Sequence, residues 1–293
     1  MENINTELRK KLESFYSKKT FFDGLLHESC KYAEECWKKQ SDNVKKESKW
    51  NYFSLPYIGK EYRGELVCVG LNVHEGGGRN LQEMQIRGIN VFKTDKEPHE
   101  NDKYGYKYDP GVIESLKTKR KPRVFFEKGM EEAVKRGDLD KVYGETDLWH
   151  RIAVYSTILL EGYSPDVADN FEKLSETYER IIYMDAIKCS PARNKSKPTK
   201  IMEDRCPDYI FFEELKIIKP DKILIMSKPV ARLMKEKYMH GSSGDFPRKG
   251  KDIDHCQIKI EEKNIDVYYI VHPGYIGRGT RTELFQELGN SIK

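Results

Sequence analysis

Four short apolar segments lie along the chain and predict buried β-strands. They are residues 65–70 (ELVCVG), 180–187 (RIIYMDAI), 221–227 (DKILIMS) and 266–272 (DVYYIVH). Each segment is rich in Ile, Val, Leu or Tyr and ends in a polar or glycine-containing stretch. Because their apolar runs are nearly continuous, the segments are typical of parallel strands that are covered on both faces.

Helical patterns separate these strands, at residues 148–163, 200–218 and 229–239. The alternation of strand and helix predicts an α/β fold with a central four-stranded parallel sheet flanked by helices. In such a sheet, functional residues gather in the loops at the carboxyl ends of the strands. Residues 1–60 are Lys-rich and predict a helical extension before the sheet.

Residues 76–146 depart from this pattern. They contain a GGG motif, many charges and the basic run LKTKRKPR, but no evident strand. A connection of this length is unusual in a compact domain unless it is functional or folds as an insertion. We therefore expect one domain over residues 1–293, with an insertion after its first strand.

Composition limits the choice of class without selecting one. Hydrophobic residues make up 38% and charged residues 34%, which is typical of a globular protein with a highly charged surface. The net charge of +4 does not establish a nucleic-acid partner, because clustering on one face matters more. The N-terminus does not resemble a signal peptide, and no apolar run suits a membrane span. We expect a cytoplasmic monomer without membrane association, whose six cysteines are thiols or metal ligands.

The strand ends carry the candidate chemistry. The first reads VGLNVHEGGGRN (69–80), where a glycine at the end of a strand lets the backbone approach a ligand closely. The second reads MDAIKCSPARNKSKPTKIMEDRC (184–206) and is the most specific. The third strand and its helix read IKPDKILIMSKPVARLM (218–234), and the fourth end reads VHPGYIGRGTR (271–281).

In that order, these segments resemble the iron–sulfur-containing family-four branch of the uracil-DNA glycosylase superfamily. In that branch a Gly-rich motif is followed by Asn-x-x-Lys-Cys-x-Pro-x-x-Asn, a helix with another Cys, a further strand and a closing His-Pro motif. The resemblance covers roughly residues 64–75 and 148–293. The matching positions are Lys188, Cys189, Pro191, Asn194, Pro198, Cys206, Pro220, His272 and Pro273.

The resemblance implies a DNA glycosylase, which hydrolyses the N-glycosidic bond of a base flipped out of DNA. No lysine is evidently poised for Schiff-base lyase chemistry, so we expect a monofunctional enzyme. Asn72 is implied to position water, and His272 to stabilise negative charge on the leaving base. The structural alternative to a catalytic role is that Asn72 caps a turn. For His272 the alternative is that it packs in the core. Family four has Glu where this chain has Leu71, and His74 or Glu75 is expected to compensate. The implied substrate-binding residues are Gly70, Leu71, His74 and Asp185.

The loop after the His-Pro pair is implied to enter DNA. Tyr275 and Ile276 are apolar enough to wedge between bases, while Arg278 and Arg281 hold phosphates. A surface loop that contains two arginines by chance is the alternative. The expected DNA contacts are, in full, Lys188, Arg193, Tyr275, Ile276, Arg278 and Arg281.

The cysteines are implied to hold a 4Fe–4S cluster, with zinc as the alternative metal. The family's first pair is a Cys-x-x-Cys, whereas this chain has five residues between its first two cysteines. We expect Cys68 and Cys256 to be buried thiols, and no motif indicates a nucleotide cofactor. The implied cluster ligands are Cys30, Cys36, Cys189 and Cys206.

Three departures from the family concern the base that is recognised. Asp185 stands where the family has the Asn that binds uracil, and an ionised Asp only accepts hydrogen bonds. It suits the amino group of cytosine better than O4 of uracil. The family's stacking Pro-Phe pair is missing, and either Phe92 or a tyrosine of the insertion is expected to substitute for it. The insertion 76–146 lies between the two pocket motifs.

These departures favour a modified cytosine as the target, of the bulky kind found in phage DNA, and hence a role in defence. The first alternative is a uracil-DNA glycosylase of base-excision repair. The second is a non-catalytic nucleic-acid binding module that keeps the fold. An α/β enzyme acting on free nucleosides or nucleotides is a further alternative.

Overall fold

A computed structural model of residues 1–293 describes residues 4–18, 31–32, 35–36, 56–59, 61–72, 148–168, 170–188, 198–239, 245–271 and 281–292. Its elements are α1 (Ile4–Lys18), β1 (Tyr57–Ile58), β2 (Leu66–Asn72), α9 (Leu148–Glu161), α10 (Phe171–Glu179), β3 (Ile181–Ile187), α11 (Lys200–Cys206), η3 (Pro207–Phe211), α12 (Phe212–Ile218), β4 (Lys222–Ile225), α13 (Lys228–Tyr238), β5 (Ile253–Ile260), β6 (Lys263–Ile270) and α14 (Arg281–Asn290). None of the helices in these ranges has the length and apolar content that crossing a membrane requires.

The described strands form one six-stranded sheet in the order β1-β3-β2-β4-β6-β5. β2 pairs in parallel with β4, and β4 pairs in parallel with β6, whereas β5 is antiparallel to β6. Every residue of β3 is buried, as expected for a strand covered on both faces. The protein therefore has an α/β fold, which confirms the predicted combination of a mostly parallel sheet with helices.

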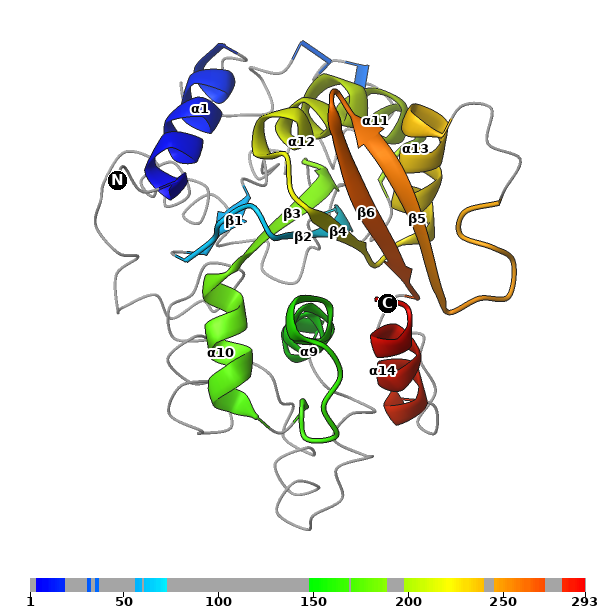
Figure 1. Ribbon diagram of the computed structural model, residues 1–293. Coiled ribbons are helices and arrows are strands. Elements are labelled where there is room, and N and C mark those ends of the chain that lie inside the picture. The colour runs from blue at the N-terminus through cyan, green and yellow to red at the C-terminus, as the bar shows by residue number, and fades with distance from the viewer. Residues whose placement is uncertain are drawn as a thin grey trace, which may run out of the picture. The chain divides into compact units, whose positions relative to one another are not determined.

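The four predicted strands are present as β2, β3, β4 and β6, and the predicted helices as α9, α11 with α12, and α13. The prediction of a four-stranded, wholly parallel sheet is wrong, because β1 and β5 also join the sheet. β5 and β6 form a hairpin with Cys256 opposite Val267 and Ile258 opposite Ile265 (Figure 1). In β5, which is the first strand of this hairpin, buried and exposed residues alternate around Ile258 and Ile260. This alternation is the period-2 pattern of a β-strand, and it is visible in the sequence.

Contacts divide the chain into two compact units. The first comprises Met1–Tyr57, Gly70–Tyr108 and Tyr183–Lys219. It therefore holds α1, α11, η3, α12 and the residues at the carboxyl ends of β2 and β3. Within this unit α1 contacts α12, and its residues Leu8 and Leu12, one helical turn apart, are buried.

The second unit comprises Ile58–Val69, Asp109–Ile182 and Pro220–Lys293. Here α9 lies between α10 and α14 and contacts both (Figure 1). The Sγ atom of Cys68 in β2 lies 3.2 Å from Oγ of Ser156 in α9. Burial raises the pKa of the Cys68 thiol to about 12, so the thiol is protonated at neutral pH. The expectation that Cys68 is a buried thiol is confirmed.

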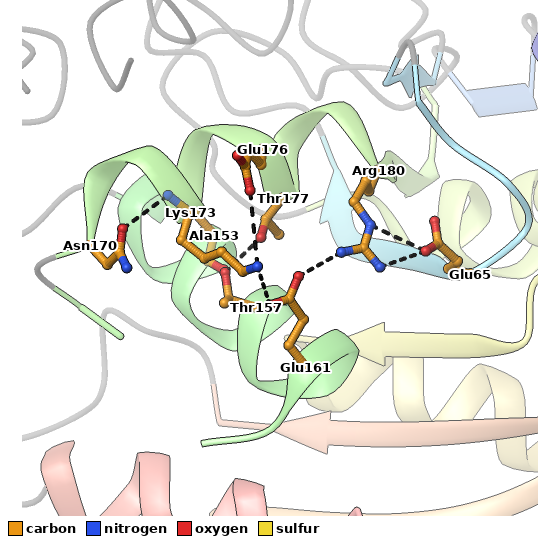
Figure 2. A network of polar contacts seen from close by, with 9 residues as sticks. All are labelled: Glu65, Ala153, Thr157, Glu161, Asn170, Lys173, Glu176, Thr177 and Arg180. Atoms are coloured by element: carbon orange, nitrogen blue, oxygen red, sulfur yellow. Dashed lines mark hydrogen bonds and ion pairs between the residues drawn. The ribbon is translucent and has the colours of Figure 1, made fainter. Parts of the chain in front are cut away.

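A network of partly exposed polar side chains joins α9 and α10 to the residues that precede β2 and β3 (Figure 2). Arg180, between α10 and β3, donates to Glu65 and to Glu161, each over 2.6 Å. Lys173 forms a second ion pair with Glu161, at 2.5 Å. Asn170 caps α10 by accepting a hydrogen bond from the backbone N–H of Lys173. Arg180 thus fixes the amino end of β3 to α9.

The predicted helix over residues 200–218 contains a π-helical turn. α11 ends at Cys206, and the turn η3 follows before α12 begins. In this turn the N–H of Phe212 donates to the carbonyl of Pro207, five residues earlier. Pro207 has no N–H to donate, and its ring crowds the carbonyl four residues before it, which interrupts the α-helical hydrogen bonding at this point.

Candidate functional site

The ends of β2 and β3 bring together Gly70 and Asp185, two of the predicted substrate-binding residues. The Asp185 side chain is fully buried, and its Oδ1 accepts a hydrogen bond of 3.3 Å from the Tyr183 hydroxyl. A β-carbon on Gly70 would lie 2.3 Å from that hydroxyl and 2.7 Å from Asp185 Oδ1. Glycine is therefore required at position 70 by a pair of the protein's own side chains, a reason that the sequence pattern did not indicate.

Two of the four predicted cluster cysteines belong to the described residues, and the fold brings them together. Cys36 comes from the N-terminal region and Cys206 from the last position of α11, yet both belong to one hydrophobic cluster, here called the thiol cluster. Leu71, which was expected to bind substrate, is partly buried and packs against this cluster. The apolar residues around the two thiols are Tyr32, Leu71, Ile187, Ile201 and Met202.

Aromatic and charged contacts attach the segment around Cys36 to the helix around Cys206. The rings of Tyr32 and Tyr209 meet edge to face, with their centroids 5.3 Å apart. Lys31 Nζ lies over both rings, at 4.7 Å from Tyr32 and 4.6 Å from Tyr209. Arg205 lies over the Tyr32 ring at 5.4 Å and reaches Glu35 at 3.7 Å. These contacts join two distant parts of the sequence at the thiol cluster.

Lys188, the first residue after β3, is held by two other residues of the same unit. Its backbone N–H donates to Cys206 Sγ over 3.2 Å. Its side chain is fully buried, with Nζ 2.6 Å from Oε2 of Glu214, which is also fully buried. A DNA-binding lysine must expose its ammonium group to a phosphate. The predicted DNA contact by Lys188 therefore disagrees with the structure, in which this lysine forms an internal ion pair.

The remaining predicted site residues are described only in part or not at all. Asn72 is the last residue of β2 and Arg281 the first of α14, and only their backbone is described. The other predicted residues of the pocket, the DNA-binding loop and the cluster lie outside the described ranges. They are Cys30, His74, Cys189, Arg193, His272, Tyr275, Ile276 and Arg278.

The thiol cluster has donors that suit a metal. Within the described ranges, no three potential ligands among His, Cys, Asp and Glu come together. Cys36 and Cys206 are both thiols, and thiolate sulfur is the ligand type preferred by iron–sulfur clusters and by zinc. The amide N–H of Lys188 points at Cys206 Sγ, and such N–H groups stabilise metal-bound thiolates. The described residues thus include two thiols of the predicted ligand set, both in one apolar cluster.

Sequence reasoning missed two residues of this region, Tyr183 and Glu214. Tyr183 stands two positions before Asp185 in the same strand, so the side chains of the two share one face of the sheet. Glu214 is an acidic residue within the apolar stretch IFFEELKII, and a charge at such a position commonly has a buried partner. Both signals were available in the sequence.

Comparison of the chain with protein-family models finds no match, and comparison with curated proteins finds none either.

Proposed function

We propose that this protein is a DNA glycosylase that removes a modified cytosine from DNA, as an enzyme of defence against phages. The observation that carries the proposal is the thiol cluster. It joins Leu71 at the end of the first predicted strand, Ile187 at the end of the second, and the cysteines Cys36 and Cys206. Segments that carry the resemblance to the family-four glycosylases thus lie side by side at this cluster, which supports the proposal.

The proposed reaction is hydrolysis of the bond between base and sugar. The base is flipped out of the DNA, and the bond breaks through a sugar that resembles an oxocarbenium ion. Asn72, the last residue of β2, positions the attacking water. His272, two residues after the end of β6, donates to the departing base and stabilises its negative charge.

The proposed preference for cytosine rests on Asp185. Its Oδ1 already acts as an acceptor toward Tyr183, and a carboxylate offers further acceptor positions to an exocyclic amino group. The side chain is fully buried, so base binding at Asp185 requires the side chains that cover it to move. The insertion 76–146 is proposed to enlarge the pocket for a bulky substituent.

The cluster proposed for this site is 4Fe–4S, held by Cys36 and Cys206 together with Cys30 and Cys189. When bound, it cross-links the chain segments that carry its thiolates. The described residues contribute the apolar surroundings of the sulfurs and the N–H group of Lys188 that donates to Cys206. The protein purified without oxygen is therefore expected to be brown and to contain iron.

The proposal is tested by mass spectrometry of the bases released from three DNAs: ordinary, uracil-containing and containing phage-type modified cytosine. Wild-type protein is expected to release the modified base, and Asn72→Ala or His272→Ala to slow release about 10²–10³-fold while DNA binding is retained. Asp185→Asn is expected to shift preference toward uracil by roughly ten- to a hundred-fold, the value of one base-specific hydrogen-bonded pair.

Other outcomes distinguish the alternatives. Ready release of uracil by the wild type, unaffected by Asp185→Asn, would identify a repair enzyme and exclude the cytosine preference. Binding of DNA without release of any base would identify a non-catalytic module. Activity on a free nucleoside that does not depend on DNA length or salt would exclude DNA as the substrate.

A further inference from the structure

The buried ion pair between Lys188 and Glu214 has no part in the reaction proposed above. Both side chains are fully buried, and Nζ and Oε2 lie 2.6 Å apart. Two buried charges lose their hydration, and a well-packed apolar pair of similar volume is often as stable. Stability alone therefore gives a weak reason for this pair, which suggests that it holds another group in place.

The group that Lys188 contacts besides Glu214 is Cys206. Lys188 binds Glu214 through its side chain, and its backbone N–H donates to Cys206 Sγ. Lys188 is thereby fixed at two points, through its side chain to α12 and through its backbone to the end of α11. A movement of the Lys188 backbone would displace the N–H group from the sulfur.

The π-helical turn explains how one lysine reaches both residues. Cys206 and Glu214 are eight positions apart, and in an uninterrupted α-helix, at about 100° per residue, their directions would differ by about 80°. A π-helical turn accommodates roughly one extra residue, so eight positions here turn the chain about as far as seven do in an α-helix. The difference falls to about 20°, and Cys206 and Glu214 share one face of the helix.

We propose that Lys188, Glu214 and the η3 turn form a clamp that positions the sulfur of Cys206 for metal binding. Lys188 and Glu214 act through Cys206 and are positioning residues. The clamp rests on the proposed metal site, but it also predicts the behaviour of the Cys206 thiol when no metal is bound. An experiment can therefore contradict the metal site without contradicting the clamp, or the clamp without the metal site.

The test uses the full-length protein and three variants, Glu214→Gln, Glu214→Asp and, as control, Glu65→Gln. Glu65→Gln weakens the partly exposed ion pair of Arg180 and leaves the clamp intact. Iron content and the rate of iron loss to a chelator are measured on folded protein. Glu214→Gln is expected to weaken iron binding about 10- to 100-fold, as is usual when a partner of a metal ligand is removed. Glu65→Gln is expected to bind iron as the wild type does.

Glu214→Asp keeps the charge but shortens the side chain by one methylene group, and it provides the test if Glu214→Gln does not fold. It is expected to lose iron faster than the wild type. In metal-free protein, the rate at which a maleimide modifies Cys206 is followed by peptide mass spectrometry. We expect a rate at least several-fold higher in the Glu214 variants and unchanged in Glu65→Gln.

Each possible outcome decides one of the two proposals. A wild type that binds neither iron nor zinc would exclude the metal site, whereas altered Cys206 labelling in the Glu214 variants would still support the clamp. Folded Glu214 variants with wild-type labelling of Cys206 and wild-type iron retention would exclude the clamp.

Discussion

A basic residue flanks β3 on each side, and the two are paired in opposite ways. Arg180, before the strand, is partly exposed and shared between two partners, Glu65 and Glu161. Lys188, after the strand, is fully buried, and Glu214 is its partner at 2.6 Å. Burial lowers the pKa of Arg180, but its hydrogen bonds to Glu65 and the charges of Glu65 and Glu161 raise it overall, so the guanidinium remains charged.

The difference in exposure determines how much each ion pair affects stability. Water and a second carboxylate compensate for the loss of either Arg180 partner, so the contact contributes little and tolerates change. Lys188 and Glu214 lie out of contact with water, and removal of either one leaves the other as a buried charge. The polar network before β3 is therefore expected to be robust, and the pair after β3 to be sensitive.

The largest expected effect is that of Lys188→Met. The substitution leaves Glu214 buried without its ammonium partner, and we expect a loss of about 3–5 kcal/mol in the free energy of unfolding. Urea denaturation followed by circular dichroism measures it. The double variant Lys188→Met/Glu214→Leu is expected to recover most of the loss, because no buried charge remains. A single variant within about 1 kcal/mol of the wild type would show that the pair is not buried in solution.

The next effect concerns Gly70→Ala. The new β-carbon would collide with the Tyr183 hydroxyl and crowd Asp185, at the distances of 2.3 and 2.7 Å given above. We expect a loss of about 1–3 kcal/mol, typical of overpacking in a core. Adding Tyr183→Phe removes the closest oxygen and should restore part of the stability. Full tolerance of alanine would mean that the Tyr183–Asp185 pair does not occupy this space.

Arg180→Ala is expected to have a smaller effect, a loss of about 0.2–1 kcal/mol that shrinks further at high salt. The side chain of Arg180 is 30% exposed, and salt screens contacts of this kind. Thermal unfolding at low and high ionic strength measures the difference. A loss as large as that of Lys188→Met, unaffected by salt, would remove the distinction between the two ends of β3.

The smallest effect on the free energy of unfolding at neutral pH is expected from the ionisation of Cys68, which takes place only at high pH. Because burial raises its pKa from 9.0 to about 12, the protonated thiol stabilises the fold fully below pH 9, and this contribution is lost as the pH rises from 9 to 12. The difference in unfolding free energy between the wild type and Cys68→Ala is therefore expected to be constant up to pH 9 and to fall above it. A difference that does not vary with pH would show that Cys68 ionises equally in both states.

The sequence permits prediction of the main strands and of the residues at their ends. Nearly continuous apolar runs such as residues 181–187 have few alternatives to a buried strand, and the position of Asp185 follows from that assignment. The proximity of Cys36 and Cys206 was expected because the resemblance implies it. β5 was missed because its alternating pattern includes only a few apolar residues and belongs to a strand exposed on one face.

The direction of individual side chains was not predictable in the same way. Lys188 stands beside several basic residues in a polar stretch, and nothing local distinguishes a buried lysine from one that contacts phosphate. The distinction depends on Glu214, which a separate helix presents. The reason for glycine at position 70 likewise depends on Tyr183, which lies on another strand. Tertiary contacts therefore determine the direction of the Lys188 side chain and the need for glycine at position 70.

The η3 turn has a consequence for the evolution of this region. Loss of one residue between Cys206 and Glu214 would turn it into regular α-helix, in which the two residues, then seven positions apart, still differ in direction by about 20°. A single deletion there is therefore expected to keep the acid on the face of Lys188 and to leave the rest of the helix in place. In homologous sequences, the acidic residue should therefore stand either eight or seven positions after the cysteine, according to whether the extra residue of the turn is present.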